Sequence, residues 1–324
     1  MHLFDLTSIT SHLLPMLPVL HGGSGYPSGV LRSDWRPEPQ IVLGVLALLA
    51  AYLTWTGPLN RRRPDAADRP VTTGQRVAFI SGCVVILIAL GPPLADWADY
   101  YLLSAHMFQH MVLIFVVAPL WLVGTPGWVL EPLTRMRGVA QVGKFITNPA
   151  ISFLLGNMLI AVWHFPIMYD YALRYEIVHA LQHGTFIPAA LLAWWPILSP
   201  LPQWPRLSRP LQCLYLFVQT IPGGLIGALI TLASPGMYGY YDLAPRLWGI
   251  DLAADQEGAG LMMWVGGGLL YLGWITIIFF RWASDEEAKE PKTGTRRVVA
   301  SSSSPGTVSP LRVQASPIDS PSGR

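Results

Sequence analysis

Seven long apolar runs constrain the fold of this chain more than any other feature. A helix needs about 20 mainly apolar residues to cross the ~30 Å hydrocarbon layer of a membrane. Runs that reach or approach this length lie near residues 41–57, 77–95, 104–124, 148–165, 178–198, 211–233 and 259–280. Only 12% of the 324 residues are charged, against roughly 25% in a soluble domain. The sequence therefore predicts an all-α membrane protein, a bundle of seven transmembrane helices.

The charges between the runs predict how the bundle is oriented. Lys and Arg gather after the first, third and fifth runs, whereas the alternate loops hold most of the acidic residues. Because excess Lys and Arg mark cytoplasmic loops, we expect the N-terminus outside and the C-terminus in the cytoplasm. The Arg61–Arg63 run fits this role as a topology anchor in contact with membrane lipid, and no nucleic-acid partner is predicted.

Composition divides the chain into three parts. Residues 1–40, rich in Gly and Pro, are expected to form an extracytoplasmic arm, and residues 41–283 a seven-helix membrane domain. Residues 284–324 contain Ser- and Pro-rich segments with little apolar material to bury, which predicts a disordered cytoplasmic tail. The two cysteines, Cys83 and Cys213, lie far apart, which argues against a thiolate-based metal carrier.

Five of the eight histidines fall in or beside apolar runs. They are His106, His110, His164, His179 and His183. Two pairs have four-residue spacing, which places both imidazoles of a pair on one helix face. The predicted orientation brings all five to a similar depth near the extracytoplasmic face. Ionisable side chains are costly inside a membrane and usually pair or bind a ligand there, so we expect these histidines to hold a metal ion. The alternative is that backbone carbonyls and interfacial water satisfy them.

Methionines influence which metal is expected. Imidazole suits zinc, copper, iron and nickel, and thioether ligands shift the choice toward Cu(I). Four methionines lie near the histidines in sequence or at the same predicted depth: Met107, Met111, Met262 and Met263. Packing alone also explains methionines in a membrane core. As a group they favour copper, and the softness of the thioether ligand favours Cu(I).

Two other uses of the histidines stay open. One is an intramembrane zinc hydrolase, although neither pair reads His-Glu-x-x-His. The general base could come from Asp96, Asp99, Asp170 or Asp255, of which Asp96 and Asp170 are favoured. The usual role of these acids is a solvated loop charge or a helix cap. The other use is haem binding. Histidines one turn apart argue against two stacked haems, but one haem near the surface remains open.

Several motifs together resemble a known family. They are Ser104–His110 with its His-Met-Phe-Gln-His sequence, Trp163–Pro166 with Tyr169–Asp170 after it, His179–His183, Trp194–Pro196, Leu214–Phe217, and Asp255–Gln256 leading to Met262–Trp264. Over roughly residues 95–280 the chain resembles the CtaG family of polytopic cytochrome c oxidase assembly factors. Glu257 departs from that pattern, which commonly has another Gln there.

The resemblance implies a non-enzymatic, multi-pass protein of the bacterial plasma membrane. Such a protein would be required for active haem-copper oxidase, and would handle or deliver copper at the extracytoplasmic side. Its expected partners are a haem-copper oxidase subunit or a copper chaperone. The choice of histidine ligands rests on the residues themselves and not on the resemblance.

Overall fold

The computed structural model describes residues 39–62, 64–65 and 68–289, and every regular element in these ranges is helical. Most of the expected arm and tail lies outside these ranges, including His2, His12 and His21. Two boundaries differ from the expectation. The first long helix already begins at Pro39, and the last continues to Lys289, so residues 284–289 are helical.

All seven apolar runs are helical. The first four correspond to α2 (Pro39–Thr54) with a π-helical turn Trp55–Leu59; to α3 (Thr73–Ala89); to α5 (Leu103–Val112), a π-helical turn Leu113–Val117 and α6 (Ala118–Gly124); and to α9 (Pro149–His164). The last three correspond to α11 (Glu176–Leu198); to α12 (Arg209–Leu232); and to α13 (Leu252–Leu261), a π-helical turn Met262–Gly266 and α14 (Gly267–Lys289). Shorter helices are α4 (Leu94–Tyr100), α7 (Gly127–Arg135), α8 (Arg137–Ile146) and α10 (Pro166–Arg174).

Length and apolar composition support fewer spans than seven. Among the described residues, four helices are long and apolar enough to cross a membrane: α2 with its π-helical turn, α5–α6, α12 and α13–α14. Two bent pairs, α3 with α4 and α8 with α9, raise the number to six if each pair is one span. The described part of the chain is thus all-helical and that of a membrane protein, while the number of seven spans and the orientation stay predictions.

The second predicted helix, 77–95, is interrupted. Its first part, α3, begins with a capping box in which Thr72 and Gln75 bond each other's backbone amides. The helix ends at Ala89, just before Gly91, and two prolines follow. Proline has no amide hydrogen and clashes with the preceding turn, so the chain bends by 48° before it resumes as α4. The bend carries α4 across the end of the bundle.

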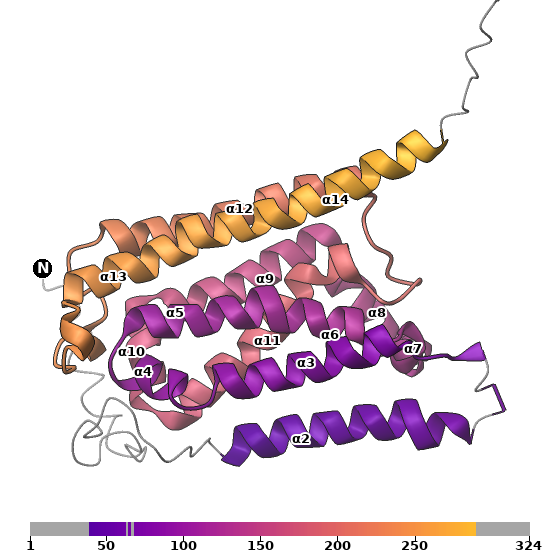
Figure 1. The fold of residues 1–324 in the computed structure, drawn as a ribbon, viewed down its shortest axis with the longest axis horizontal. Coiled ribbons are helices and arrows are strands. Elements are labelled where there is room, and N and C mark those ends of the chain that lie inside the picture. Colours follow the sequence, from indigo (N-terminus) through magenta and orange to yellow (C-terminus); the bar gives the residue numbers. More distant parts are fainter. Residues whose placement is uncertain (1–38, 63, 66–67, 290–324) are drawn as a thin grey trace, which may run out of the picture.

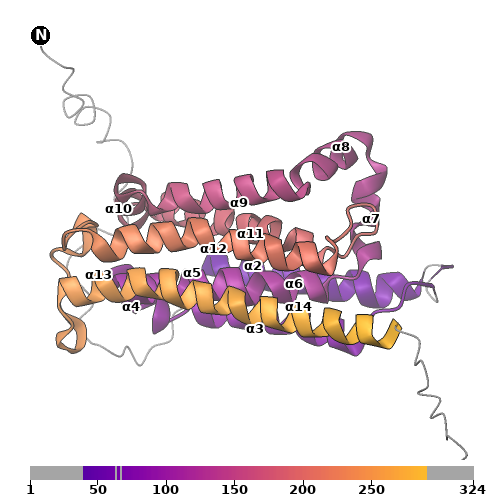
Figure 2. The same cartoon turned by 90° about the horizontal axis from the view of Figure 1, so that it is seen from above.

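The long helices lie side by side, and the short helices gather at the two ends (Figure 1, Figure 2). Helices α4, α10 and α13 lie at one end, whereas α7 and α8 lie at the other (Figure 1). The N-terminal ends of α5 and α11 and the C-terminal end of α9 all meet at the end with α4 and α10. This arrangement brings the five histidines to the same end of the molecule.

Helix α2 is anchored mainly through its second half. The Tyr52 ring stacks on Phe79 of α3 at 3.8 Å, and its hydroxyl donates a hydrogen bond to the carbonyl of Gly124, 2.9 Å away. At the other end of α2, Gln40 donates a hydrogen bond to Glu176 at the start of α11 (3.3 Å). Between these points α2 borders a groove that reaches the histidines, described below.

The opposite end of the bundle is tied by one arginine. Arg209, the first residue of α12, donates a hydrogen bond to the carbonyl of Arg281 (2.6 Å) and forms an ion pair with Asp285. Lys289 pairs with Glu286 one turn earlier, at 2.8 Å. These contacts lie along the part of α14 that continues past the apolar run.

Candidate metal centre

All five predicted histidines converge at one end of the bundle. The ring centroids of His106 and His110 on α5 are 4.4 Å apart, and those of His179 and His183 on α11 are 4.5 Å apart. The His106 ring lies 5.7 Å from that of His179 and 6.0 Å from that of His183. His164, at the end of α9, lies 5.8 Å from His110. We call these five residues the histidine cluster.

Three members of the cluster can approach a single ion. One ligand atom from each of His106, His179 and His183 lies within 4.8 Å of the others. His110 adjoins this trio, because its Nε2 is 3.0 Å from the Nε2 of His106. Three or four imidazoles around one point are a common arrangement for a transition metal.

Asp255 fixes the start of α5, and with it the position of His106 and His110. This buried carboxylate accepts hydrogen bonds from the backbone amides of Leu103 (2.7 Å) and Ser104 (3.1 Å) and from the Ser104 hydroxyl. It therefore caps α5 from a different helix, α13, where a negative charge also favours the positive end of the helix dipole. The role of helix cap considered for Asp255 is confirmed.

Asp99 supports His179 from α4. Its carboxylate Oδ1 lies 3.6 Å from the Nε2 of His179, and both side chains are largely buried. A carboxylate beside one imidazole nitrogen orients the ring and leaves the other nitrogen for a ligand. The expectation of a solvated loop charge or a cap is therefore wrong for Asp99, because the bend after α3 carries this residue inward.

His164 is held at its ring by a backbone carbonyl and at its own carbonyl by a tyrosine hydroxyl. Its Nδ1 is 2.8 Å from the carbonyl oxygen of Ile160, and the Tyr238 hydroxyl donates a hydrogen bond to the His164 carbonyl oxygen (2.9 Å). The Nε2 of His164 points into a buried environment without a hydrogen-bond partner among the described residues. His164 therefore adjoins the cluster with one ring nitrogen unused.

Tyrosines cover the cluster at the end of the bundle formed by α4 and α10. The ring of Tyr169 on α10 lies 5.1 Å from that of His106, and its hydroxyl is 3.2 Å from the hydroxyl of Tyr241, which in turn donates to the carbonyl of Ala98 (2.6 Å). Burial raises the pKa of Tyr169 well above its ordinary value, and Asp99 contributes to the rise. Tyr169 therefore remains a neutral phenol, suited to hydrogen bonding. Only its place within the resembling motifs could have suggested this residue.

Unpartnered nitrogens show that the cluster suits a cation. Among the described residues, the Nδ1 atoms of His106 and His110 and the Nε2 atoms of His164 and His183 are buried without a hydrogen-bond partner. Buried polar groups normally have partners, and each one left without a partner has an energetic cost. A metal ion bound by imidazole nitrogens would remove that cost, so the donor set fits such an ion.

The four methionines lie in apolar packing clusters. Met107 and Met263 share one with Leu103 and Tyr169. Met111 belongs to a second cluster, which includes Phe115, and Met262 packs against this second cluster. Their predicted assistance to a metal stays a prediction.

The two glutamines of the His-x-x-Gln-His motifs are fully buried. Gln109 donates a hydrogen bond to the Ala89 carbonyl (2.8 Å) and so ties α5 to the end of α3. Neither amide atom of Gln182 has a hydrogen-bond partner among the described residues. Gln109 is therefore structural, whereas Gln182 offers an unused polar group beside His183.

Asp170, one of the two acids favoured as a general base, has a structural partner. Its Oδ1 accepts a hydrogen bond from the backbone amide of Tyr240 (3.3 Å). Burial raises the pKa of the Asp170 carboxyl, which this hydrogen bond and Arg174 partly counteract. Asp170 thus fastens the loop that carries Tyr238 and Tyr241 over the cluster.

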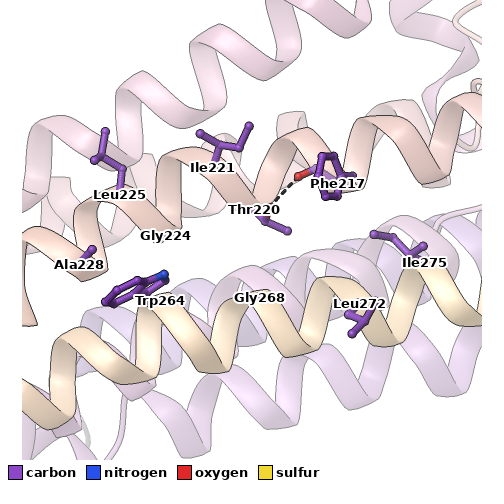
Figure 3. Close-up of a pocket in the computed structure, with 10 residues that line it drawn as sticks. All are labelled: Phe217, Thr220, Ile221, Gly224, Leu225, Ala228, Trp264, Gly268, Leu272 and Ile275. Atoms are coloured by element: carbon purple, nitrogen blue, oxygen red, sulfur yellow. Dashed lines mark hydrogen bonds between the residues drawn. The ribbon is translucent and has the colours of Figure 1, made fainter.

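A second hollow, between α12 and α14, offers little chemistry (Figure 3). Its volume is about 480 Å³, and apart from Thr220 and Trp264 its lining is apolar or glycine. The Thr220 hydroxyl is already bonded to the carbonyl of Phe217 (2.7 Å, dashed in Figure 3). No titratable residue lines this hollow, so the histidine cluster is the stronger candidate site.

Comparison with known proteins agrees with the motifs gathered around the cluster. No curated protein and no solved structure matches the chain. A family model described as cytochrome c oxidase caa3 assembly factor (Caa3_CtaG) matches residues 50–285. The match includes all five histidines of the cluster, Asp99 and Asp255, and confirms the resemblance seen in the sequence. A match over more than half of its length shows that the chain belongs to the family of cytochrome c oxidase caa3 assembly factors.

Proposed function

We propose that this assembly factor handles copper for the oxidase. It takes the ion into the histidine cluster at the extracytoplasmic end of the bundle and passes it to an oxidase subunit or a copper chaperone. The observation that carries the proposal is the approach of His106, His179 and His183, whose ligand atoms lie within 4.8 Å of one another. The membrane would be the bacterial plasma membrane, as the family implies.

The donor set supports a cargo ion that is bound reversibly. Imidazole nitrogens bind copper well, and the described cluster contains no thiolate that would hold Cu(I) in a closed cage. Among the described residues, Asp99 lies 3.6 Å from the ring of His179, a member of the trio. Nearby thioethers would favour Cu(I) over Zn²⁺. These features suit a carrier that must release its ion to a partner. The proposed role is therefore not enzymatic.

No specific observation favours the zinc hydrolase or the haem protein. Asp170, a base considered for hydrolysis, is bonded to the Tyr240 amide. Two imidazoles on opposite faces of one haem iron stand about 4 Å apart, at metal–nitrogen distances near 2 Å. The Nε2 atoms of His106 and His110 face each other at 3.0 Å, so this pair does not provide such a spacing.

Copper content tests the proposal directly. The protein is purified in detergent, loaded with Cu(I) under reducing conditions, desalted and analysed for metal. We expect bound copper in the wild type and loss of that copper when His110 and His183 are both replaced by alanine. Copper stoichiometry that is unchanged in the double variant would rule out the cluster as the site.

A control separates loss of ligands from loss of fold. Gln212 is a buried polar residue on α12 that donates a hydrogen bond to the Leu207 carbonyl (2.8 Å), towards the opposite end of the bundle. Gln212→Ala should disturb packing to a similar degree and keep its copper. In cells, we expect the histidine double variant to lower the activity of the caa3-type oxidase, with partial recovery when copper is added to the medium.

A further inference from the structure

A groove between α2, α3 and α11 leads from the surface to the histidine cluster. Its volume is about 340 Å³, and both His179 and His183 form part of its wall. Gln40 and Glu176 stand at one side, where the Gln40 amide donates a hydrogen bond to the Glu176 carboxylate (3.3 Å). The groove thus joins an acidic, polar edge to two of the proposed ligands.

Burial shows why this groove matters. Four of the five histidines are nearly inaccessible, with exposed fractions of 0% for His106, 2% for His110, and 5% for His164 and His179. His183 alone is partly exposed, and it faces the groove. An ion must arrive where a ligand can be reached.

The outer end of the bundle offers less access. Tyr169, Tyr238 and Tyr241 cover the cluster there, and each is at most 2% exposed. Their hydroxyls bond one another or backbone carbonyls, including that of His164. A route through this side would require these buried bonds to break, whereas the groove is already open.

We propose that this lateral groove is the route by which a monovalent copper ion enters and leaves the cluster, with Glu176 as its first contact and His183 as the first ligand. The inference rests on the proposed copper-handling function. A carboxylate at the edge attracts a cation, and the imidazole of His183 then receives it from the groove. Movement of the ion from His183 to the buried His106 completes loading, and the reverse order releases it.

Two glycines allow the groove to be blocked without disturbing the packing. Gly184 on α11 and Gly44 on α2 both line it, are exposed, and would place an added Cβ in open space. Leucine at either position should fill the groove from one wall. Gly273 on α14 is also exposed with open space around its Cβ, so Gly273→Leu is the matched control.

The experiment measures rates and the final amount of copper separately. Detergent-purified protein is mixed with Cu(I) in acetonitrile-containing buffer, and release is followed by colour when excess bicinchoninate is added. We expect Gly184→Leu and Gly44→Leu to slow uptake and release by about tenfold or more, with the final copper content unchanged. Glu176→Gln, which keeps an acceptor for Gln40, should slow uptake mainly at low ionic strength.

A second measurement needs no metal. Diethyl pyrocarbonate, a small neutral reagent, should modify His183 in the wild type and in Gly273→Leu, and should do so more slowly in the two groove-filling variants. Wild-type rates in both of these variants would overturn the route while leaving copper binding intact. Absence of copper from the wild type would instead overturn the proposed function and this inference with it.

Discussion

The carboxylate of Asp99 lies 3.6 Å from the Nε2 of His179, although 80 residues separate them in the sequence. The contact exists because the chain bends after α3 and sends α4 across the end of the bundle towards α11. Asp99, which the sequence alone presents as a loop charge, therefore lies against His179, a proposed ligand. The orientation of His179 therefore depends on the bend as well as on α11.

Asp99→Asn should weaken copper binding without removing it. The amide keeps the shape of the side chain but loses the charge that orients the imidazole, and comparable substitutions behind metal ligands reduce affinity by about 10- to 100-fold. Competition with a Cu(I) chelator measures the change. Glu257→Gln, which removes the charge of an exposed acid on α13, should leave the affinity near that of the wild type. Equal affinities in all three proteins would contradict the supporting role of Asp99.

Asp255→Asn should lower stability and copper affinity together. The substitution removes the charge that the amides of Leu103 and Ser104 share, and loss of a helix cap costs about 1–2 kcal/mol. Circular dichroism in detergent should show a lower unfolding temperature. The control is Glu257→Gln, an exposed position on the same helix. A wild-type unfolding temperature for Asp255→Asn would show that the cap contributes little.

The helices and the histidines were predictable because each leaves a local signal. Apolar runs of sufficient length require helices in a membrane, and all seven runs are helical. Four-residue spacing places His106 with His110 and His179 with His183 on shared faces, and the structure brings the two pairs together. The alternation of loop charges predicted the orientation of the helices. That orientation placed the five histidines at a similar depth, which is why one cluster was predicted.

The contacts between distant segments were not predictable. The sequence has glycine runs at Gly223–Gly224 and Gly266–Gly268, and small residues of this kind allow helices to pack closely. The tight crossing of α12 and α13 instead uses Gly227 and Gly260, where an added Cβ would come within 2.7 Å of the other helix's backbone. Which face of a helix meets its neighbour depends on the rotation of both helices, and no short motif encodes it. For the same reason, the position of Asp99 against His179 and the groove beside α2 could not be predicted from the sequence.

Two glycine substitutions on α13 should therefore have opposite effects. Gly260→Ala would place its Cβ 2.6 Å from the Thr231 amide nitrogen, and such overpacking costs about 1–3 kcal/mol. Gly258→Ala meets open space and should stabilise the helix by up to about 1 kcal/mol, because alanine favours helix more than glycine does. Unfolding temperatures in detergent compare the two variants. A gain in stability for Gly260→Ala would mean that α12 and α13 do not approach so closely.

Replacing Met107 and Met263 with leucine tests whether thioethers select the metal. Both residues lie in one apolar cluster, and exchange of methionine for leucine preserves volume at a cost usually below about 1.5 kcal/mol. The fold should therefore survive. If sulfur contributes to Cu(I) binding, the preference for Cu(I) over Zn²⁺ should fall in this variant, because the remaining imidazoles bind both metals. Parallel titrations with the two ions measure that preference, and the control exchanges the distant, exposed Met158 for leucine. Unchanged selectivity in the double variant would assign these two methionines to packing alone and leave the choice of metal to the histidines.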